Sequence, residues 1–234
     1  MRRKGTGAFL FAVLVASSGV LAEDPPDSQL NPVTGNVESV DISIAAGARV
    51  RHTTNLGGSS RIVELISSPG AVAPRLAIDS EGDSWATWWK NANGEVYYAF
   101  KDLASGVWSA EAMLSEPGKV SRNPEIAHGS SVAWVAWETV SSSTTAIEVT
   151  GITDDPEPIP VHTIRVTGFL GDPDVLVHAE SGHVWVTWID STTDVGWSEY
   201  DAASEAWDLP QFESYLGTST TTARSTIRNA VLGP

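Results

Sequence analysis

Short runs of β-branched and aromatic residues, separated by Gly, Asn, Asp, Ser and Pro, follow one another through most of the chain. No stretch carries an apolar stripe of helical period, so the pattern predicts an all-β protein. Some runs are apolar on both faces; residues 133–137, for example, are Ala-Trp-Val-Ala-Trp. Because a half-exposed strand alternates apolar with polar residues, such runs are predicted to be strands covered on both sides.

This pattern occurs three times at a regular interval. Pro74, Pro124 and Pro173 are 50 and 49 residues apart (124 − 74 and 173 − 124), and a Trp-x-x-Trp pair follows each of them. The pairs are Trp85 and Trp88, Trp134 and Trp137, and Trp185 and Trp188. A repeat of this length is typical of β-propellers, in which each repeat is one four-stranded blade. In the first repeat, turns with Gly and Asn predict strands at about 75–78, 84–89, 95–101 and 110–114.

The first 37 residues differ from the rest. Arg2, Arg3 and Lys4 precede an apolar run at 8–16, and small residues precede Glu23, which predicts a secretory signal peptide over residues 1–22. The run is shorter than a membrane span, so a secreted or periplasmic protein is expected, with no membrane contact after cleavage. Residues 23–37 are rich in proline and polar groups and are predicted to be a flexible leader.

Residues 38–234 are predicted to form one β-propeller domain. Complete blades are expected at about 73–117, 123–167 and 172–216, with a partial blade at 38–70 that lacks its first strand. Residues 224–232 have the character of a first strand without a blade. This closing strand is predicted to pair with the partial blade, which gives a closed ring of four blades and a monomer. The rival is a partial propeller completed by self-association, by another chain or by missing sequence.

The charge of the chain limits its expected partners, and its cysteine content limits how the fold is held together. The chain carries 14 basic and 29 acidic residues, a formal net charge of -15. Nucleic acid and anionic membrane surfaces are therefore not expected partners. The chain has no cysteine, so an exported form is held together by its core without disulfides.

Part of the first repeat resembles blades of sialidase-like (BNR-type) β-propellers, and the likeness extends over most of residues 60–216. The elements that carry it are Pro74, the Asp79-x-x-Gly82 turn, Trp88, the Tyr97-Tyr98 pair and the Gly106-Val-Trp108-Ser109 link. The resemblance implies the fold and gives no activity. The sialidase Asp-box is absent, since in its nearest approach, residues 192–197, the aromatic falls two positions too early. No catalytic residue is carried over. More loosely, the tryptophan-rich repeats are similar to sugar-binding propeller lectins.

Most of the ten tryptophans are expected in the core, because the repeated pairs lie inside strands covered on both sides. Trp89, Tyr98 and Trp197 lie nearer strand ends, where a side chain can reach the mouth of a ring. These three are the predicted ligand-binding residues.

Catalytic and metal-binding patterns are weak. There is no Gly-x-Ser-x-Gly elbow, and the sequence does not identify a carboxylate pair for glycoside hydrolysis. His178 and His183 flank a turn, but a pair without a third ligand is more often surface than zinc site. Two acidic groups are candidates for calcium: Asp154, Asp155 and Glu157, or Asp172 and Asp174. A solvated acidic loop is the preferred interpretation of both, so no metal or other cofactor is expected.

The sequence thus predicts an exported, non-catalytic propeller module that binds a glycan or an extracellular protein through loops at the mouth of the ring. A small extracellular glycoside-acting enzyme of sialidase-like fold is the first alternative. A partial propeller that self-associates is the second.

Overall fold

A computed structural model describes residues 27–57, 60–129, 131–153, 159–167, 171–178, 181–190 and 194–214. The predicted signal peptide at 1–22 and the predicted closing strand at 224–232 lie outside these ranges. Within them, no helix is long and apolar enough to cross a membrane.

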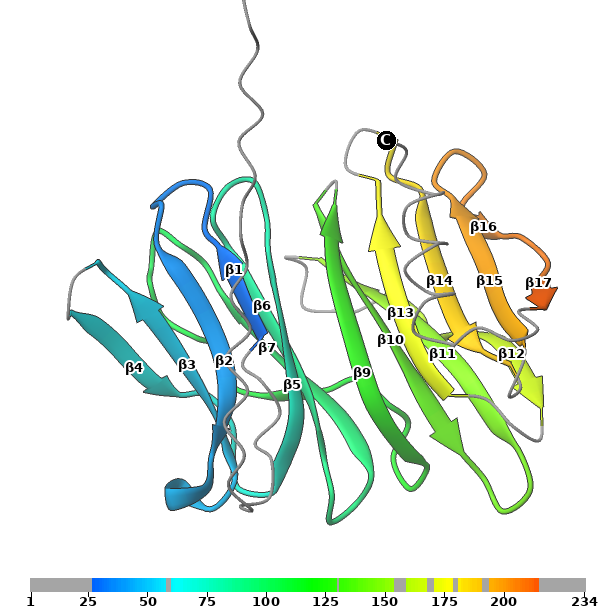
Figure 1. Cartoon of the computed structure of the whole chain (residues 1–234), viewed down its shortest axis with the longest axis horizontal. Coiled ribbons are helices and arrows are strands. Elements are labelled where there is room, and N and C mark those ends of the chain that lie inside the picture. The colour runs from blue at the N-terminus through cyan, green and yellow to red at the C-terminus, as the bar shows by residue number, and fades with distance from the viewer. Residues whose placement is uncertain are drawn as a thin grey trace, which may run out of the picture.

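The described chain forms four antiparallel sheets, one after another along the sequence (Figure 1). The first holds β1 (Asp27–Leu30), β2 (Val37–Ser43), β3 (Arg49–Asn55) and β4 (Arg61–Leu65), with the short 3-10 turn η1 (Ile44–Ala46) between β2 and β3. The second holds β5 (Ala71–Ile78), β6 (Ser84–Lys90), β7 (Glu95–Lys101) and β8 (Ala112–Met113). The third holds β9 (Val120–Gly129), β10 (Val132–Val140), β11 (Thr145–Ile152) and β12 (His162–Thr167). The fourth holds β13 (Gly171–Val177), β14 (Val184–Ile189), β15 (Asp194–Asp201), β16 (Ala206–Trp207) and β17 (Gln211–Ser214). The predicted all-β fold of four-stranded propeller blades is confirmed.

The first sheet has its own first strand at residues 27–30, inside the predicted leader at 23–37, and this strand completes the blade that was expected to be partial at 38–70. Residues 27–30 form β1, which pairs with β2. Asp27 and Gln29 bond to the backbone of β5: Asp27 Oδ2 accepts from Leu76 N at 2.8 Å, and Gln29 Oε1 accepts from Ile78 N at 3.0 Å. The polar composition that suggested disorder thus satisfies backbone groups of a neighbouring strand. The edge of β2 that would have received residues 224–232 is occupied by β1.

Each pair of neighbouring sheets encloses a hydrophobic cluster, and the Trp-x-x-Trp pairs contribute to two clusters at once. In β10, Trp134 packs between the third and fourth sheets, whereas Trp137 packs between the second and third. In β6, Trp85 likewise faces the following sheet and Trp88 the preceding one. The pair therefore explains why these strands are apolar on both faces.

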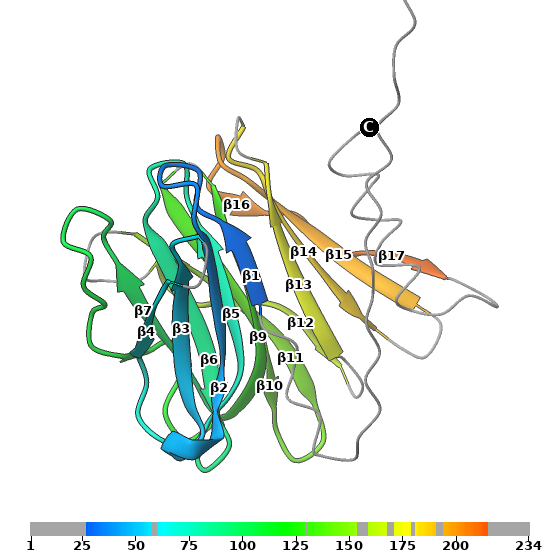
Figure 2. The same ribbon diagram turned by 60° about the vertical axis from the view of Figure 1, so that its left-hand side comes forward.

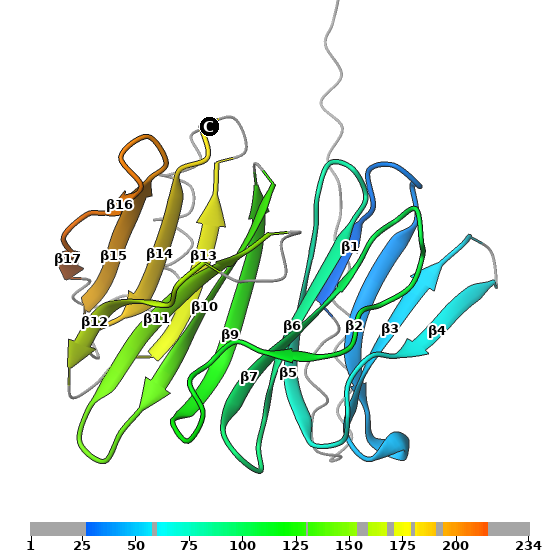
Figure 3. The ribbon, with the colours of Figure 1, turned by 180° about the vertical axis from the view of Figure 1, so that it is seen from behind.

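The sheets form an arc. The first strands β1, β5, β9 and β13 contact one another in this order (Figure 2). The three clusters lie at the junctions of the first with the second, the second with the third, and the third with the fourth sheet. Within the described ranges, no strand of the fourth sheet packs against the first to a comparable extent. These two sheets lie at opposite ends of the molecule (Figures 1 and 3).

Candidate functional site

A pocket lies where β1 ends, beside the β5–β6 and β9–β10 turns. Its volume is about 590 Å³. The residues that line it come from the first three sheets and their turns: Leu30, Pro32, Ile78, Asp79, Ser80, Glu81, Asp83, Trp85, His128, Gly129 and Ser131. The lining thus combines apolar side chains with three carboxylates, two hydroxyls and an imidazole.

The β5–β6 turn is held by two of the three carboxylates. Asp79 Oδ1 accepts hydrogen bonds from the backbone N–H of Glu81 at 2.9 Å and of Asp83 at 2.8 Å. Asp83 Oδ1 accepts from Leu103 N at 2.7 Å. Gly82 has φ +91, and a Cβ there would lie 2.7 Å from Leu103 Cδ2, so the turn requires glycine. Because the turn is fixed in this way, the Glu81 side chain is left exposed at the pocket.

Glu81 differs from the other two carboxylates in its bonding. Its side chain makes no hydrogen bond or ion pair with any other described residue. The carboxylate is therefore available to accept hydrogen bonds from a ligand.

Trp85 and His128 form the aromatic part of the lining. Their rings stack with centroids 4.5 Å apart and an interplanar angle of 23°. Trp85 is 2% exposed and also packs against Phe100 at 4.8 Å. Its Nε1 is buried without a hydrogen-bond partner in the described part of the chain. This indole belongs to the core of the second junction and meets the pocket at the same time.

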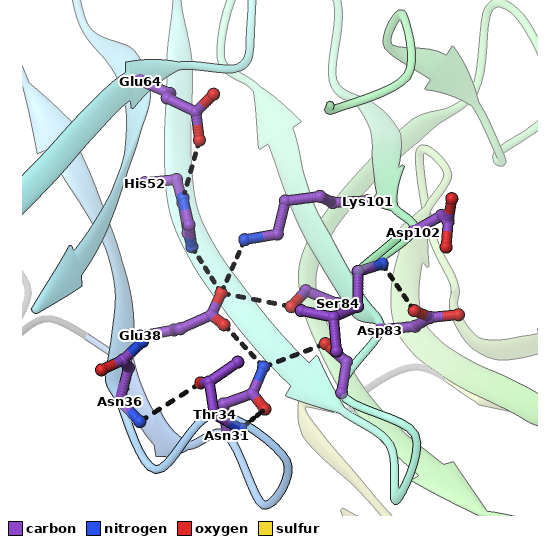
Figure 4. A network of polar contacts seen from close by, with 12 residues as sticks. Asn31, Thr34, Asn36, Glu38, His52, Glu64, Asp83, Ser84, Lys101 and Asp102 are labelled. Atoms are coloured by element: carbon purple, nitrogen blue, oxygen red, sulfur yellow. Dashed lines mark hydrogen bonds and ion pairs between the residues drawn. The ribbon is translucent and has the colours of Figure 1, made fainter. Parts of the chain in front are cut away.

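Asn31 connects the pocket to a buried polar network (Figure 4). Its Nδ2 donates to Gly82 O in the β5–β6 turn at 2.9 Å and to Glu38 Oε1 at 2.7 Å. Glu38 Oε2 in turn lies 2.8 Å from His52 Nε2 and accepts from Lys101 Nζ at 2.9 Å. The network therefore positions the turn that carries Glu81.

Glu38 is ionised throughout the ordinary pH range. Burial alone would raise its pKa, but hydrogen bonds from His52, Lys101 and Asn31 outweigh burial and lower the pKa from 4.5 to about 2. Ser84 Oγ donates a further hydrogen bond at 3.2 Å. His52 also has Glu64 Oε2 3.4 Å from its Nδ1. Both oxygens of Glu38 are engaged within this network, whereas His52 Nδ1 makes no hydrogen bond among the described residues.

The pocket favours ligands that donate hydrogen bonds. No Lys or Arg is among the residues that line it, whereas carboxylates and hydroxyls supply acceptors. Leu30, Pro32 and Ile78 offer apolar contact area beside these acceptors. A small neutral or cationic molecule with both hydroxyl or amino groups and apolar edges fits this lining.

The three ligand-binding residues predicted from the sequence do not line the pocket. Trp89 and Tyr98 are partly buried and pack against the cluster between the second and third sheets. Burial raises the pKa of the Tyr98 hydroxyl. Trp197 is half-buried in β15 of the fourth sheet, opposite Thr187. The structure thus places two of them in one junction and the third elsewhere, and their role in binding stays a prediction.

Metal-binding groups do not gather in the described residues. No cluster of three or more His, Asp or Glu side chains suited to a metal ion occurs within those ranges. His178 Nδ1 is bonded within its turn to Ser181, and His183 Nδ1 lies 2.5 Å from Glu199 Oε1. The calcium candidates Asp154 and Asp155, with Glu157, lie outside the described residues.

Sequence reasoning missed most of this site. Asp79 and Gly82 were identified only as a turn and Trp85 only as a core residue, while His128 and Glu38 carried no recognised motif. A signal for the network existed, because Glu38 and His52 alternate with the apolar Val40 and Val50 on the inward side of β2 and β3. No sequence pattern indicates that three separate turns meet at one pocket.

Comparison with known proteins shows the fold and no more. No protein-family model matches the sequence, and no curated protein matches it. Among solved structures, a Hadza microbial sialidase, Hz136, superimposes with a TM-score of 0.58 at 11% identity, over 83% of this chain and 46% of the sialidase. An ulvan lyase of family PL25 superimposes with a TM-score of 0.54 at 8% identity, over 78% of this chain and 56% of the lyase. A GH43 β-1,3-galactosidase superimposes with a TM-score of 0.52 at 14% identity, over 88% of this chain and 48% of the galactosidase. The chain spans about half the length of these structures, and all share its propeller-type fold.

Proposed function

We propose that the protein is an exported, non-catalytic propeller module that binds a neutral carbohydrate in the pocket between β1 and the β5–β6 and β9–β10 turns. The observation that carries the proposal is the lining: acceptors and apolar side chains, with no Lys or Arg. Sugar hydroxyls donate hydrogen bonds to carboxylates, and the C–H edges of the ring contact apolar surface. The volume of about 590 Å³ is in the range of small-molecule sites.

The charge of the pocket argues for a neutral ligand. Asp79, Glu81 and Asp83 place three carboxylates at one opening, in a chain with a net charge of -15. An anionic sugar would be repelled by these groups and would find no cation in the lining to pair with. A sialic acid or a uronic acid is therefore a poor ligand, although the solved structures of similar fold include a sialidase and an ulvan lyase.

The bonding of the carboxylates argues for binding rather than turnover. Glycoside hydrolysis uses two carboxylates, one of which transfers a proton to the leaving group. Asp79 and Asp83 each use an oxygen to hold backbone N–H groups of the turn region, which leaves Glu81 as the carboxylate with no described partner. One carboxylate positions a sugar but does not make an acid and nucleophile pair.

Glycan binding and its loss on substitution test the proposal. The mature chain is expected to retain neutral oligosaccharides on a glycan array, and Glu81→Gln is expected to weaken the affinity measured by calorimetry about tenfold or more, since a hydrogen bond to a charged group contributes about 1.5–3 kcal/mol. Glu205→Gln is the matched control, because Glu205 is an exposed glutamate in the fourth sheet's β15–β16 turn, away from the pocket lining.

Three outcomes would contradict the proposal. These are binding of no glycan, preference for sialylated or uronic oligosaccharides, and equal affinities for Glu81→Gln and the unmodified chain. Hydrolysis of a fluorogenic glycoside would show that the protein is an enzyme rather than a binding module. Export is part of the same proposal, and N-terminal sequencing of the product released from cells should start at Glu23.

A further inference from the structure

The turn between β5 and β6 carries an excess of negative charge. Asp79, Glu81 and Asp83 lie within residues 79–83, and all three line the pocket. None of them forms an ion pair with a Lys or Arg of the described chain, and no Lys or Arg is among the lining residues. Three carboxylates therefore border one cavity without a positive side chain beside them to balance their charge.

These carboxylates keep oxygens for a ligand. Asp79 uses Oδ1 to hold the backbone N–H groups of Glu81 and Asp83, and Asp83 uses Oδ1 to hold Leu103 N. The Oδ2 atoms of both aspartates, and both oxygens of Glu81, have no hydrogen-bond partner among the described residues. Each carboxylate of the turn can therefore accept a hydrogen bond from a bound molecule.

The oxygens are not arranged as a metal site. Within the described ranges, no group of three or more His, Asp or Glu side chains is placed to hold a metal ion. Calcium needs about six or more oxygens that converge on one point. An ammonium group needs no such convergence, because it donates three hydrogen bonds in different directions. The charge of the turn therefore suits an organic ammonium group better than a metal ion.

The rest of the lining requires more of a ligand than positive charge. Leu30, Pro32 and Ile78 supply apolar contact area. Trp85 is 2% exposed, and its Nε1 has no hydrogen-bond partner among the described residues, so the lining holds an unused donor as well as unused acceptors. A sugar ring suits such a lining, since it combines apolar C–H edges with hydroxyl oxygens that accept hydrogen bonds. A simple amine without hydroxyls lacks these acceptors.

We propose that the pocket binds a hexose with one free, protonated amino group more tightly than the same hexose with a hydroxyl or an acetylated nitrogen at that position. This inference rests on the proposed carbohydrate binding and narrows it, because the charge that excludes anionic sugars attracts a cationic one. The ammonium group is held by Glu81 and the turn at 79–83. Hydrogen bonds between charged groups are about twice as strong as those between neutral groups, so an advantage of about tenfold is expected.

Matched sugars test the preference. The probes are the methyl glycosides of glucosamine, galactosamine and mannosamine, each compared with its parent hexoside and its N-acetyl derivative. Dissociation constants are measured by NMR titration of the mature chain at about pH 6, where an aliphatic amine is protonated. We expect at least one amino glycoside to bind about tenfold more tightly than both of its neutral counterparts. This advantage should shrink as the salt concentration rises from about 0.05 to 0.5 M.

Two variants that each remove one charge locate the effect. Glu81→Gln should bring the affinities for the amino and the parent glycoside close to each other. Its fold should be unaffected, because the Glu81 side chain is exposed and has no partner among the described residues. Glu205→Gln should keep the full advantage, since Glu205 is exposed and lies outside the pocket lining. Attraction by the net charge of the chain falls equally in both variants.

Each other result would overturn the inference. Equal affinities for the amino, acetylated and parent sugars would show that the pocket does not recognise the ammonium group, while the carbohydrate proposal would stand. Binding of none of these glycosides would also remove the preference, and only a failure of the glycan array as well would remove carbohydrate binding. An equal loss of the advantage in Glu205→Gln would assign it to the net charge of the chain rather than to the turn at 79–83.

Discussion

A carboxylate buried between two sheets costs free energy unless its oxygens are fully paired. Glu38 is 2% exposed, and its two oxygens contact Asn31, His52, Lys101 and Ser84. These partners come from the β1–β2 turn, β3, β7 and β6, so one side chain ties the first sheet to the second. Through Asn31 the same carboxylate also fixes the β5–β6 turn of the pocket.

The lowered pKa of Glu38 predicts acid sensitivity. A carboxyl group whose pKa falls from 4.5 to about 2 on folding stabilises the folded state fully above pH 4.5, and that contribution is lost as the pH falls towards 2. Glu38→Gln should lower the free energy of unfolding at pH 7 by about 3 kcal/mol, because Lys101 and His52 lose their charged partner. Between pH 5 and 2, the free energy of unfolding of Glu38→Gln should also change less than that of the unmodified chain.

Urea unfolding at a series of pH values measures both effects. Glu81→Gln is the control, since Glu81 has no described partner and should follow the unmodified chain. If the free energy of unfolding fell in parallel for Glu38→Gln and the unmodified chain between pH 5 and 2, Glu38 would not be the cause of the loss of stability in acid.

At the scale of elements, β1 shows that side chains can tie a strand of one sheet to the next sheet. It has four residues, and the side chains of Asp27 and Gln29 bond to the backbone of β5 in the next sheet. Gln29 makes two of these bonds, as a donor to Leu76 O at 2.6 Å and as an acceptor from Ile78 N. β1 thus belongs to the first sheet by pairing and to the second by contact.

Gln29→Ala should therefore loosen the junction of the first two sheets. Losing two hydrogen bonds and leaving backbone groups of β5 without these partners should lower the free energy of unfolding by about 1–3 kcal/mol. The amide of Ile78 should also exchange faster with solvent in hydrogen-exchange mass spectrometry. Gln211→Ala is the control, because Gln211 is exposed and its side chain bonds, among the described residues, to the nearby Leu209 O. Unchanged exchange at Ile78 would contradict the role given to Gln29.

The elements that the sequence predicted well are those whose environment is local and repeated. The strands expected at 84–89 and 95–101 correspond closely to β6 and β7, because apolar runs between glycine and asparagine turns define both. β1 could not be predicted in this way, since Asp27 and Gln29 are suited to a strand only once β5 lies beside them. The pocket was hidden for the same reason: Glu81, Trp85 and His128 meet only after three sheets pack together.

Within the described ranges, the main contacts of each sheet in the molecule are with its neighbours along the arc. Its three clusters are related by the tryptophan pair, but their polar surroundings differ. Trp137 Nε1 donates to Thr139 Oγ1 and to Glu148 Oε2, both at 3.1 Å, whereas Trp88 Nε1 has no partner among the described residues. Both indoles are fully buried, so they form a matched pair for comparing the central junction with the first one.

Trp137→Phe should be the more damaging of the two equivalent substitutions. Each replaces a buried indole with a smaller ring, but only Trp137→Phe removes a donor from the buried carboxylate of Glu148, which is 4% exposed. The difference in free energy of unfolding should be about 1–3 kcal/mol, measured by thermal or urea unfolding of both variants. Equal losses of free energy of unfolding in the two variants would mean that packing alone determines how much each junction stabilises the fold.

The two ends of the arc have consequences for how copies of the molecule meet at high concentration. Head-to-tail growth of a filament needs the far side of one copy's first sheet to complement the far side of the next copy's fourth sheet. Among the described residues, the far side of the first sheet carries the Asp41–Arg51 ion pair beside the exposed Val63 and Leu65, and that of the fourth carries Glu199 beside Trp185 and Trp197. Bringing the two ends together would strip water from Asp41, Arg51 and Glu199, which costs free energy unless each of these groups finds a partner across the contact. Charged groups at both ends of the arc thus restrict open-ended stacking of copies to arrangements in which these charges are paired.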